Sequence, residues 1–165
     1  QQVKRLAHKH GALLIFDDGT IPVVIRETTR REYNGYVDAV SGYVLFNSQK
    51  DVANPETINL EDNLNRLIER EFGITPDKLG KKTLVGAYGH PNTGEFDFAH
   101  LVRVKLDANH FNTDKAYADQ KEGKLILLRG YDDVQKVLNG ELFADKGKMY
   151  GLWGEMSSLE KNDFK

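Results

Sequence analysis

The clearest pattern of apolar and polar positions in the chain lies between residues 59 and 74. Apolar residues recur there at steps of three and four, the spacing of one face of an amphipathic helix: Leu60, Leu64, Leu67, Ile68 and Phe72. Asn59 is suited to cap the first turn, and Gly73 is suited to end the helix in the left-handed conformation. The pattern therefore predicts a helix over 59–74. Glu71 shares a side with this apolar face, and a carboxylate in such a place must be paired, solvated or used.

Shorter apolar runs bounded by turn residues predict strands on either side of this helix. The runs before it are 11–16, 21–26 and 36–46, and those after it are 84–88, 95–106 and 124–129. An Asp-Gly step separates the first two runs, so we expect those strands to pair as a hairpin. An isolated glycine in a strand marks a bulge or a close approach of another segment, which is the expectation for Gly42. A second helix is expected at 131–138, ended by Asn139 and Gly140.

The order of these elements predicts an α+β fold in which helices cover a mixed sheet. A length of 165 residues, with 39% hydrophobic and 29% charged residues, is typical of one globular domain. We therefore expect a single domain over 1–165, with a core over about 11–138 and a helical tail over 139–165. The polar residues 1–10 are expected to form a solvated lead-in. The first residue is a glutamine, which is compatible with a fragment of a longer chain.

Composition also restricts the classes of function. A net charge of −2 provides no broad positive surface and argues against a nucleic-acid partner. The absence of cysteine excludes disulfides, thiolate catalysis and thiolate metal ligands. It fits a reducing compartment, so we expect a cytoplasmic location. No apolar run approaches the roughly 20 residues of a membrane span, so no membrane association is expected.

Residues 66–74, R-L-I-E-R-E-F-G-I, resemble the second half of the Nudix box, R-E-U-x-E-E-x-G-U with U apolar. The matching positions are Arg66, Ile68, Glu71, Gly73 and Ile74. Leu67 and Arg70 stand where the family has glutamates, and Val52 and Ile58 stand where the first half of the box has its glycine and glutamate. The chain therefore resembles a Nudix domain with a degenerate box.

Two predicted strands extend the resemblance. Tyr36, Asp38, Ser41 and Gly42 are similar to the W-D-L-S-x-G-G-H strand of isopentenyl-diphosphate isomerase relatives within the superfamily, with Tyr43 in place of the second glycine. The run F-D-F-A-H-L-V-R-V at 96–104 resembles the Nudix strand that borders the substrate pocket. His100 lies on the apolar face of this strand, either as a hydrogen-bonded core histidine or as a catalytic base.

The resemblance implies an α/β/α sandwich with a mixed sheet. It also implies hydrolysis of nucleoside diphosphates linked to another moiety, with Mg²⁺ bound by glutamates of the helix. The candidate catalytic residues are then Glu71 and His100, and the candidate metal ligands are Glu71 and Glu69. The candidate ligand-binding residues are Arg66, Arg70, Ser41 and Gly42.

Arg70 argues against the usual metal site. A unit positive charge about 4 Å from a divalent cation repels it by about 8 kcal/mol at an effective dielectric constant of 20. The side chain can swing away, so this figure is an upper limit. Arg66 matches the family arginine that orients the glutamates, and an Arg66–Glu71 ion pair is the expected remnant of the site.

Three hypotheses follow. In the first, the domain binds a nucleoside-diphosphate-type ligand or a protein partner without efficient hydrolysis. In the second, it is an active Nudix-type hydrolase with a relocated metal site, formed by Glu71 with other carboxylates from the set Glu56, Glu61, Glu95 and Asp97. In the third, it is a structural interaction module that binds a protein through residues 47–58 or through the tail around Trp153.

Overall fold

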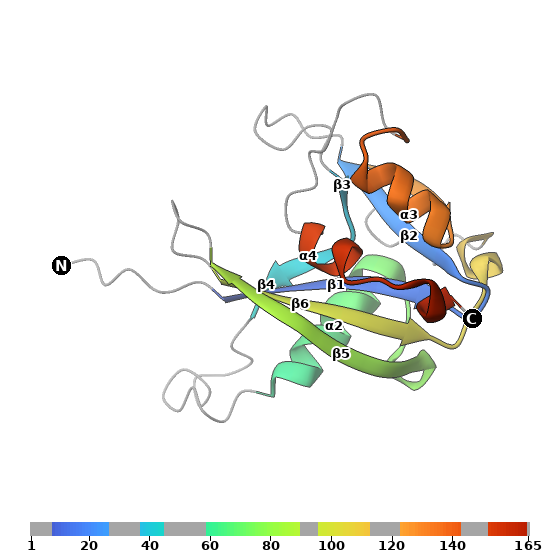
Figure 1. Cartoon of the computed structure of the whole chain (residues 1–165). Helices are drawn as coiled ribbons and strands as arrows, with labels where there is room; N and C mark the ends of the chain where they lie inside the picture. The colour runs from blue at the N-terminus through green and yellow to red at the C-terminus, as the bar shows by residue number, and fades with distance from the viewer. Residues whose placement is uncertain are drawn as a thin grey trace.

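The structure is a computed structural model of the chain, and it describes residues 8–26, 37–44, 59–89, 96–112, 123–142 and 152–164. A mixed sheet with the strand order β4-β1-β6-β5 lies at its centre (Figure 1). Its strands are β1 (His8–Phe16), β4 (Val40–Tyr43), β5 (Leu79–Gly89) and β6 (Phe96–Val104). β1 runs parallel to β6, and the other two pairings are antiparallel. Because β1 begins at His8, residues 8–10 belong to a strand and not to the solvated lead-in that their polarity predicted.

A second, antiparallel sheet has the strand order β3-β2-β7 and contains β3 (Val37–Asp38), β2 (Thr20–Arg26) and β7 (Gly123–Arg129). The Asp-Gly turn before β2 forms as expected, with Gly19 at φ 78° and its N–H donating to the Phe16 carbonyl at 2.9 Å. The hairpin prediction is nevertheless wrong. β1 pairs with β6 along its whole length and with β4 at Lys9–Ala12, whereas β2 pairs with β3 and β7, so the turn directs the chain into the other sheet.

The segment predicted as one strand over 36–46 is divided between the two sheets. β3 pairs with β2, and β4 pairs with β1 after a bend at Ala39. The Ala39 N–H donates to the Asp38 carboxylate at 2.8 Å, which satisfies a backbone donor where the ladder is interrupted. This change of sheet places Ser41 and Gly42 beside the long helix. Residues 45–58, which include the predicted loop at 47–58, lie outside the described residues.

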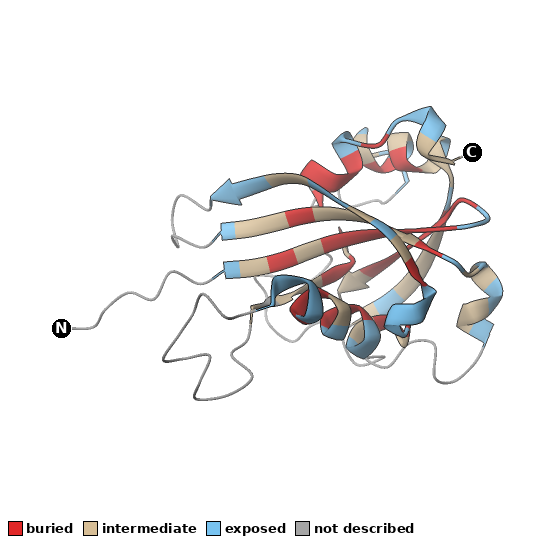
Figure 2. Cartoon of the chain, turned by 90° about the horizontal axis from the view of Figure 1, so that it is seen from below, coloured by how far each residue is buried: buried red, intermediate tan, exposed pale blue. Residues whose placement is uncertain are grey.

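The long helix, α2 (Leu60–Phe72), begins and ends as the sequence predicts. The Asn59 side chain accepts a hydrogen bond from the backbone N–H of Asp62 at 3.1 Å, and Gly73 adopts the left-handed conformation with φ 66°. The apolar face is buried at Leu64, Leu67, Ile68 and Phe72. Figure 2 shows this buried side of α2 turned toward the sheet and its exposed side turned outward.

Helices cover both faces of the mixed sheet. α2 packs on one face, and α4 (Trp153–Ser157) contacts β1, β5 and β6 on the other (Figure 1). α3 (Tyr131–Leu138) lies against β7 and α4, and three short 3-10 helices complete the described structure: η2 (Pro76–Lys78), η3 (Ala108–Asn112) and η4 (Lys161–Phe164). The predicted α+β fold with helices on a mixed sheet is therefore confirmed. None of the helices in the described part of the chain has the length and apolar character needed to cross a bilayer.

Each face of the sheet has its own apolar core. Leu14, Phe16 and Val102 lie under α2, together with the helix residues Leu64 and Phe72. The core on the opposite side contains residues of both sheets, α3 and the tail: Leu13, Ile15, Ile21, Val23, Val37, Ala39, Leu128, Val134, Val137, Leu152, Met156 and Leu159. Successive side chains of β1 and β6 point to opposite faces of the sheet, and this alternation decides which of them pack against α2 and which against α4.

Candidate functional site

The edge between α2 and β4 brings together four of the residues that the sequence singled out. The Glu71 carboxylate accepts a hydrogen bond from the Ser41 N–H at 3.3 Å, and the other carboxylate oxygen lies 3.7 Å from the Arg70 guanidinium. The Glu71 side chain is 12% exposed and the Arg70 side chain is 58% exposed. Glu71 is thus paired in the way that its place beside an apolar face requires.

Gly42 completes this edge, and its role is close packing. A Cβ added at Gly42 would lie 2.5 Å from one methyl group of Leu67 and 3.5 Å from Nη2 of Arg70. Carbon atoms in contact normally stay about 3.5–4.0 Å apart, so a side chain here would force the buried Leu67 side chain to move. The sequence predicted either a bulge or a close approach of another segment at Gly42, and the structure has the close approach. Leu67 and Arg70 fill the space directly beside it.

This arrangement does not fit a magnesium site of the Nudix type. Magnesium binds through oxygen ligands in nearly octahedral geometry. Of the positions that resemble the Nudix glutamates, one holds the buried, apolar Leu67 and a second holds the cation of Arg70 beside Glu71. In the described part of the chain, no cluster of three histidine, aspartate or glutamate side chains is arranged to bind a metal ion.

The other candidate residues have different surroundings. Arg66 and Glu69 lie at exposed positions of α2, and the Glu69 carbonyl accepts the hydrogen bond that caps the helix. The Arg66–Glu71 ion pair remains a prediction, because the ion pair described for Glu71 is with Arg70. Among carboxylates proposed for a relocated site, Glu61 lies 3.0 Å from the Lys82 ammonium, and Glu56 and Glu95 lie outside the described residues.

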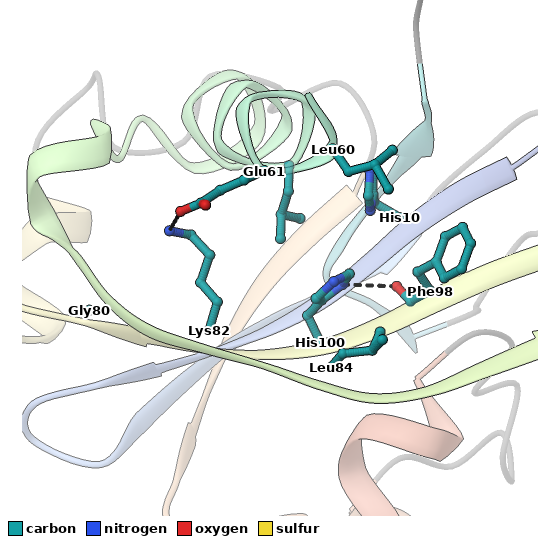
Figure 3. Close-up of a pocket in the computed structure, with 9 residues that line it drawn as sticks. His10, Leu60, Glu61, Gly80, Lys82, Leu84, Phe98 and His100 are labelled. Atoms are coloured by element: carbon teal, nitrogen blue, oxygen red, sulfur yellow. Dashed lines mark hydrogen bonds and ion pairs between the residues drawn. The ribbon is translucent and has the colours of Figure 1, made fainter. Parts of the chain in front are cut away.

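His100 lines a separate cavity of about 470 Å³ between the first turn of α2 and strands β1, β5 and β6 (Figure 3). Its Nδ1 lies 3.0 Å from the Phe98 carbonyl oxygen and 3.2 Å from that of Gly11. Because both neighbours are carbonyl oxygens, Nδ1 carries a proton and donates to them. His100 is therefore hydrogen-bonded to the sheet, and its ring also contributes to the cavity wall.

Sequence reasoning missed the burial of two polar side chains. His10 is 2% exposed, and neither of its ring nitrogens has a hydrogen-bond partner among the described residues. Burial, reinforced by the neighbouring His100, lowers the pKa of His10 to about 4. Its ring centroid lies 5.6 Å from that of His100. The alternation of His8 and His10 is compatible with one side of a strand, but the polarity of residues 1–10 predicted a solvated segment.

Glu155 of α4 is the second. It is fully buried, and neither carboxylate oxygen has a hydrogen-bond partner among the described residues. Burial raises the pKa of Glu155 to about 8, and the carboxylates of Asp38 and Asp97 add to the effect. One of its oxygens would lie 2.8 Å from a Cβ at Gly11, so the backbone of β1 passes directly beside it.

Comparison with known proteins identifies the fold. The MutT protein from Methanosarcina mazei Go1 is 16% identical, with a TM-score of 0.55 over 91% of this chain and 88% of that one. A mutT/nudix family protein from Listeria innocua is 16% identical, with a TM-score of 0.53 over 81% of this chain and 82% of its own. The Nudix domain of Shewanella oneidensis NrtR, solved in complex with ADP-ribose, is 12% identical, with a TM-score of 0.53 over 81% and 79% of the two chains.

The chain thus has the Nudix fold, as the degenerate box at 66–74 predicted. No protein-family model matches its sequence, and no curated protein matches it either.

Proposed function

We propose that this domain binds a ligand containing a nucleoside diphosphate at the edge between α2 and β4, without magnesium-dependent hydrolysis. The observation that carries the proposal is the packing of Leu67 and Arg70 against Gly42, beside the single remaining carboxylate of Glu71. At this edge a guanidinium group lies where a divalent cation would need a carboxylate ligand. A guanidinium group can bind a phosphate through two parallel hydrogen bonds.

Two further observations support binding at this edge. The Arg70 side chain is more than half exposed, so a phosphate can reach it without displacing the core. ADP-ribose, the ligand in the NrtR Nudix domain structure, contains a diphosphate of the kind proposed here. Arg66, one turn before Arg70 and also exposed, is the second cation proposed to contact the ligand.

The test is isothermal titration of the protein with ADP-ribose, once with MgCl₂ and once with EDTA. We expect binding in both buffers with similar affinity. Arg70→Gln should weaken it by about tenfold or more, because a charge-assisted hydrogen bond contributes about 1.5–3 kcal/mol. The matched control is Lys136→Gln, which removes an exposed cation from α3. Absence of ADP-ribose binding, or equal affinity in the Arg70 variant, would contradict the proposed site.

Hydrolysis is tested separately. Incubation of ADP-ribose with the protein and MgCl₂, followed by chromatography of the products, should show no cleavage above the buffer control. Cleavage that requires Mg²⁺ and disappears in Glu71→Gln would establish the alternative, an active hydrolase. The two experiments therefore separate a failure of binding from a failure of the inactivity proposal.

A further inference from the structure

The cavity beside His100 has the form of a binding site that is distinct from the α2–β4 edge. Its apolar wall is formed by Leu60, Leu64, Leu84 and Phe98. Leu60 is 49% exposed and Leu84 is 58% exposed, so large apolar groups remain in contact with water. A volume of about 470 Å³ lies within the range of small-molecule pockets. Figure 3 shows Leu60 and Glu61 on the α2 side of the cavity, with His100 and Leu84 rising from the sheet opposite.

His10 provides an unused polar group in this wall. A neutral imidazole has one N–H donor and one nitrogen acceptor, and both ring nitrogens of His10 are buried without a partner among the described residues. Leaving a buried polar group unpaired is unfavourable, and a ligand hydroxyl could satisfy it by donating to one nitrogen or accepting from the other. The ring of the neighbouring His100 lies 5.6 Å from that of His10 and also lines the cavity.

Lys82 provides a cation on the other side of the cavity. Its side chain is 19% exposed, and its ammonium lies 3.0 Å from the Glu61 carboxylate, which is 67% exposed. An ammonium group has three donors, and one exposed carboxylate occupies only part of its capacity. Lys82 is therefore able to bind a second, ligand carboxylate.

The topology gives the spacing between these two groups. His10 is on β1 and Lys82 is on β5, and β6 lies between these strands. Neighbouring strands are about 4.8 Å apart. The register places His10 opposite Phe98 but Lys82 opposite Val102, four residues further along β6, so the two Cα positions are separated by roughly 16 Å. A single functional group of a ligand therefore cannot contact both His10 and Lys82. A ligand that uses the whole cavity needs a carboxylate at one end and a hydrogen-bonding group at the other.

We propose that this cavity binds a small organic acid with an apolar, preferably aromatic body and a hydroxyl group remote from its carboxylate. The carboxylate pairs with Lys82, the apolar body covers Leu60, Leu84 and Phe98, and the hydroxyl group hydrogen-bonds to His10. The site uses none of the residues of the α2–β4 edge, so its test is separate from that of the proposed nucleotide binding.

The test uses three related probes: 3-(4-hydroxyphenyl)propionate, 3-phenylpropionate without the hydroxyl group, and 4-ethylphenol without the carboxylate. Isothermal titration of the whole chain should show the first binding most tightly. Loss of the carboxylate should weaken binding by about tenfold or more, and loss of the hydroxyl group by about fivefold, as expected for charged and neutral hydrogen bonds.

Two variants connect each end of the probe to its residue. Lys82→Gln should remove the advantage of the carboxylate but keep that of the hydroxyl group, and His10→Phe should do the reverse. Lys81→Gln, the adjacent exposed lysine that does not line the cavity, should leave all three affinities unchanged. Comparison of ¹H–¹⁵N correlation spectra confirms that each variant is folded.

No measurable binding of 3-(4-hydroxyphenyl)propionate at millimolar concentration would overturn the proposal. So would equal affinities for the three probes, or a carboxylate preference that persists in Lys82→Gln. If His10→Phe is unfolded, the wild-type protein still decides the question: the ¹⁵N resonances of the His10 ring must shift with 3-(4-hydroxyphenyl)propionate more than with 3-phenylpropionate.

Discussion

Replacing Glu155 by glutamine should stabilise the protein, and the gain should grow with pH. Glutamine keeps the shape of a protonated glutamic acid but cannot ionise. In the folded chain the pKa of Glu155 is raised from 4.5 to about 8, first by burial and then by the carboxylates of Asp38 and Asp97. In the unfolded chain the carboxyl group ionises freely. Between pH 4.5 and about 8, the folded chain therefore keeps a proton on Glu155 that the unfolded chain releases.

The sign and size of the effect follow from this difference. Below pH 4.5 the group is protonated in both states, and Glu155 causes no penalty relative to glutamine. As pH rises from 4.5 to about 8, the wild-type protein loses stability relative to the variant by about 1.4 kcal/mol per pH unit. The full difference is on the order of 5 kcal/mol at pH 8 as an upper limit.

His10 acts in the opposite direction but does not disturb the comparison. Its pKa is lowered from 6.5 to about 4, so it adds stability that is present above pH 6.5 and lost as pH falls toward 4. Wild type and Glu155→Gln both contain His10, so the difference between them isolates Glu155. In the wild-type protein alone, the two slopes oppose each other between pH 4.5 and 6.5.

The assay is urea unfolding followed by circular dichroism at pH 5.5, 6.5 and 7.5, with linear extrapolation to water. Glu141→Gln is the matched control, because Glu141 is exposed and the same charge is removed. The free energy of unfolding of Glu155→Gln should exceed that of wild type by an amount that increases at each step, whereas the control should run parallel to wild type. Parallel pH profiles for wild type and Glu155→Gln would refute the reasoning, because Glu155 would then be charged and compensated in the folded protein.

Three further predictions concern α2 and its edge. Gly42→Ala should lower the free energy of unfolding by about 1–3 kcal/mol by forcing the added methyl group against Leu67, and adding Leu67→Ala should make the Gly42 substitution nearly neutral; a urea-unfolding double-mutant cycle measures this coupling. The double substitution Leu67→Glu and Arg70→Glu should create affinity for Mn²⁺ in isothermal titration that wild type lacks; no gain would show that the edge cannot form a metal site even with carboxylates. Asn59→Ala should lower the free energy of unfolding by about 1 kcal/mol through loss of the helix cap, and an unchanged urea midpoint would contradict the cap.

The sequence predicted local structure better than it predicted partners. The period of the apolar residues located α2 and its ends, because capping and helical spacing are properties of adjacent residues. The Asp-Gly step likewise located the turn before β2. It did not reveal that β1 pairs with β4 and β6 and not with β2, because those pairings depend on residues distant in the sequence. A turn specifies a reversal of direction, whereas the pairing depends on the strands that compete for each edge.

The same distinction applies to the candidate site. The substitutions at Leu67 and Arg70 were readable from the motif, since they occupy positions within one helix. The burial of His10 and Glu155 was not predictable, because it arises from contacts of the His10 ring with β6 and from the packing of α4 on β1. Neither residue lies in a motif, and both are flanked by residues of ordinary polarity. Folding removes both side chains from water, and this desolvation is the largest cause of their shifted pKa values.

The parallel pairing of β1 with β6 also has a consequence for the order of events during folding. Leu13 lies opposite Leu101, a separation of 101 − 13 = 88 residues along the chain. A contact of this kind requires closure of a long loop before it contributes any stability, and such contacts slow folding. During synthesis β1 is made before β6, so the residues of β1 that are buried in the folded chain cannot pair with β6 until later. The first strand of the mixed sheet therefore has the longest time to pair with a wrong partner.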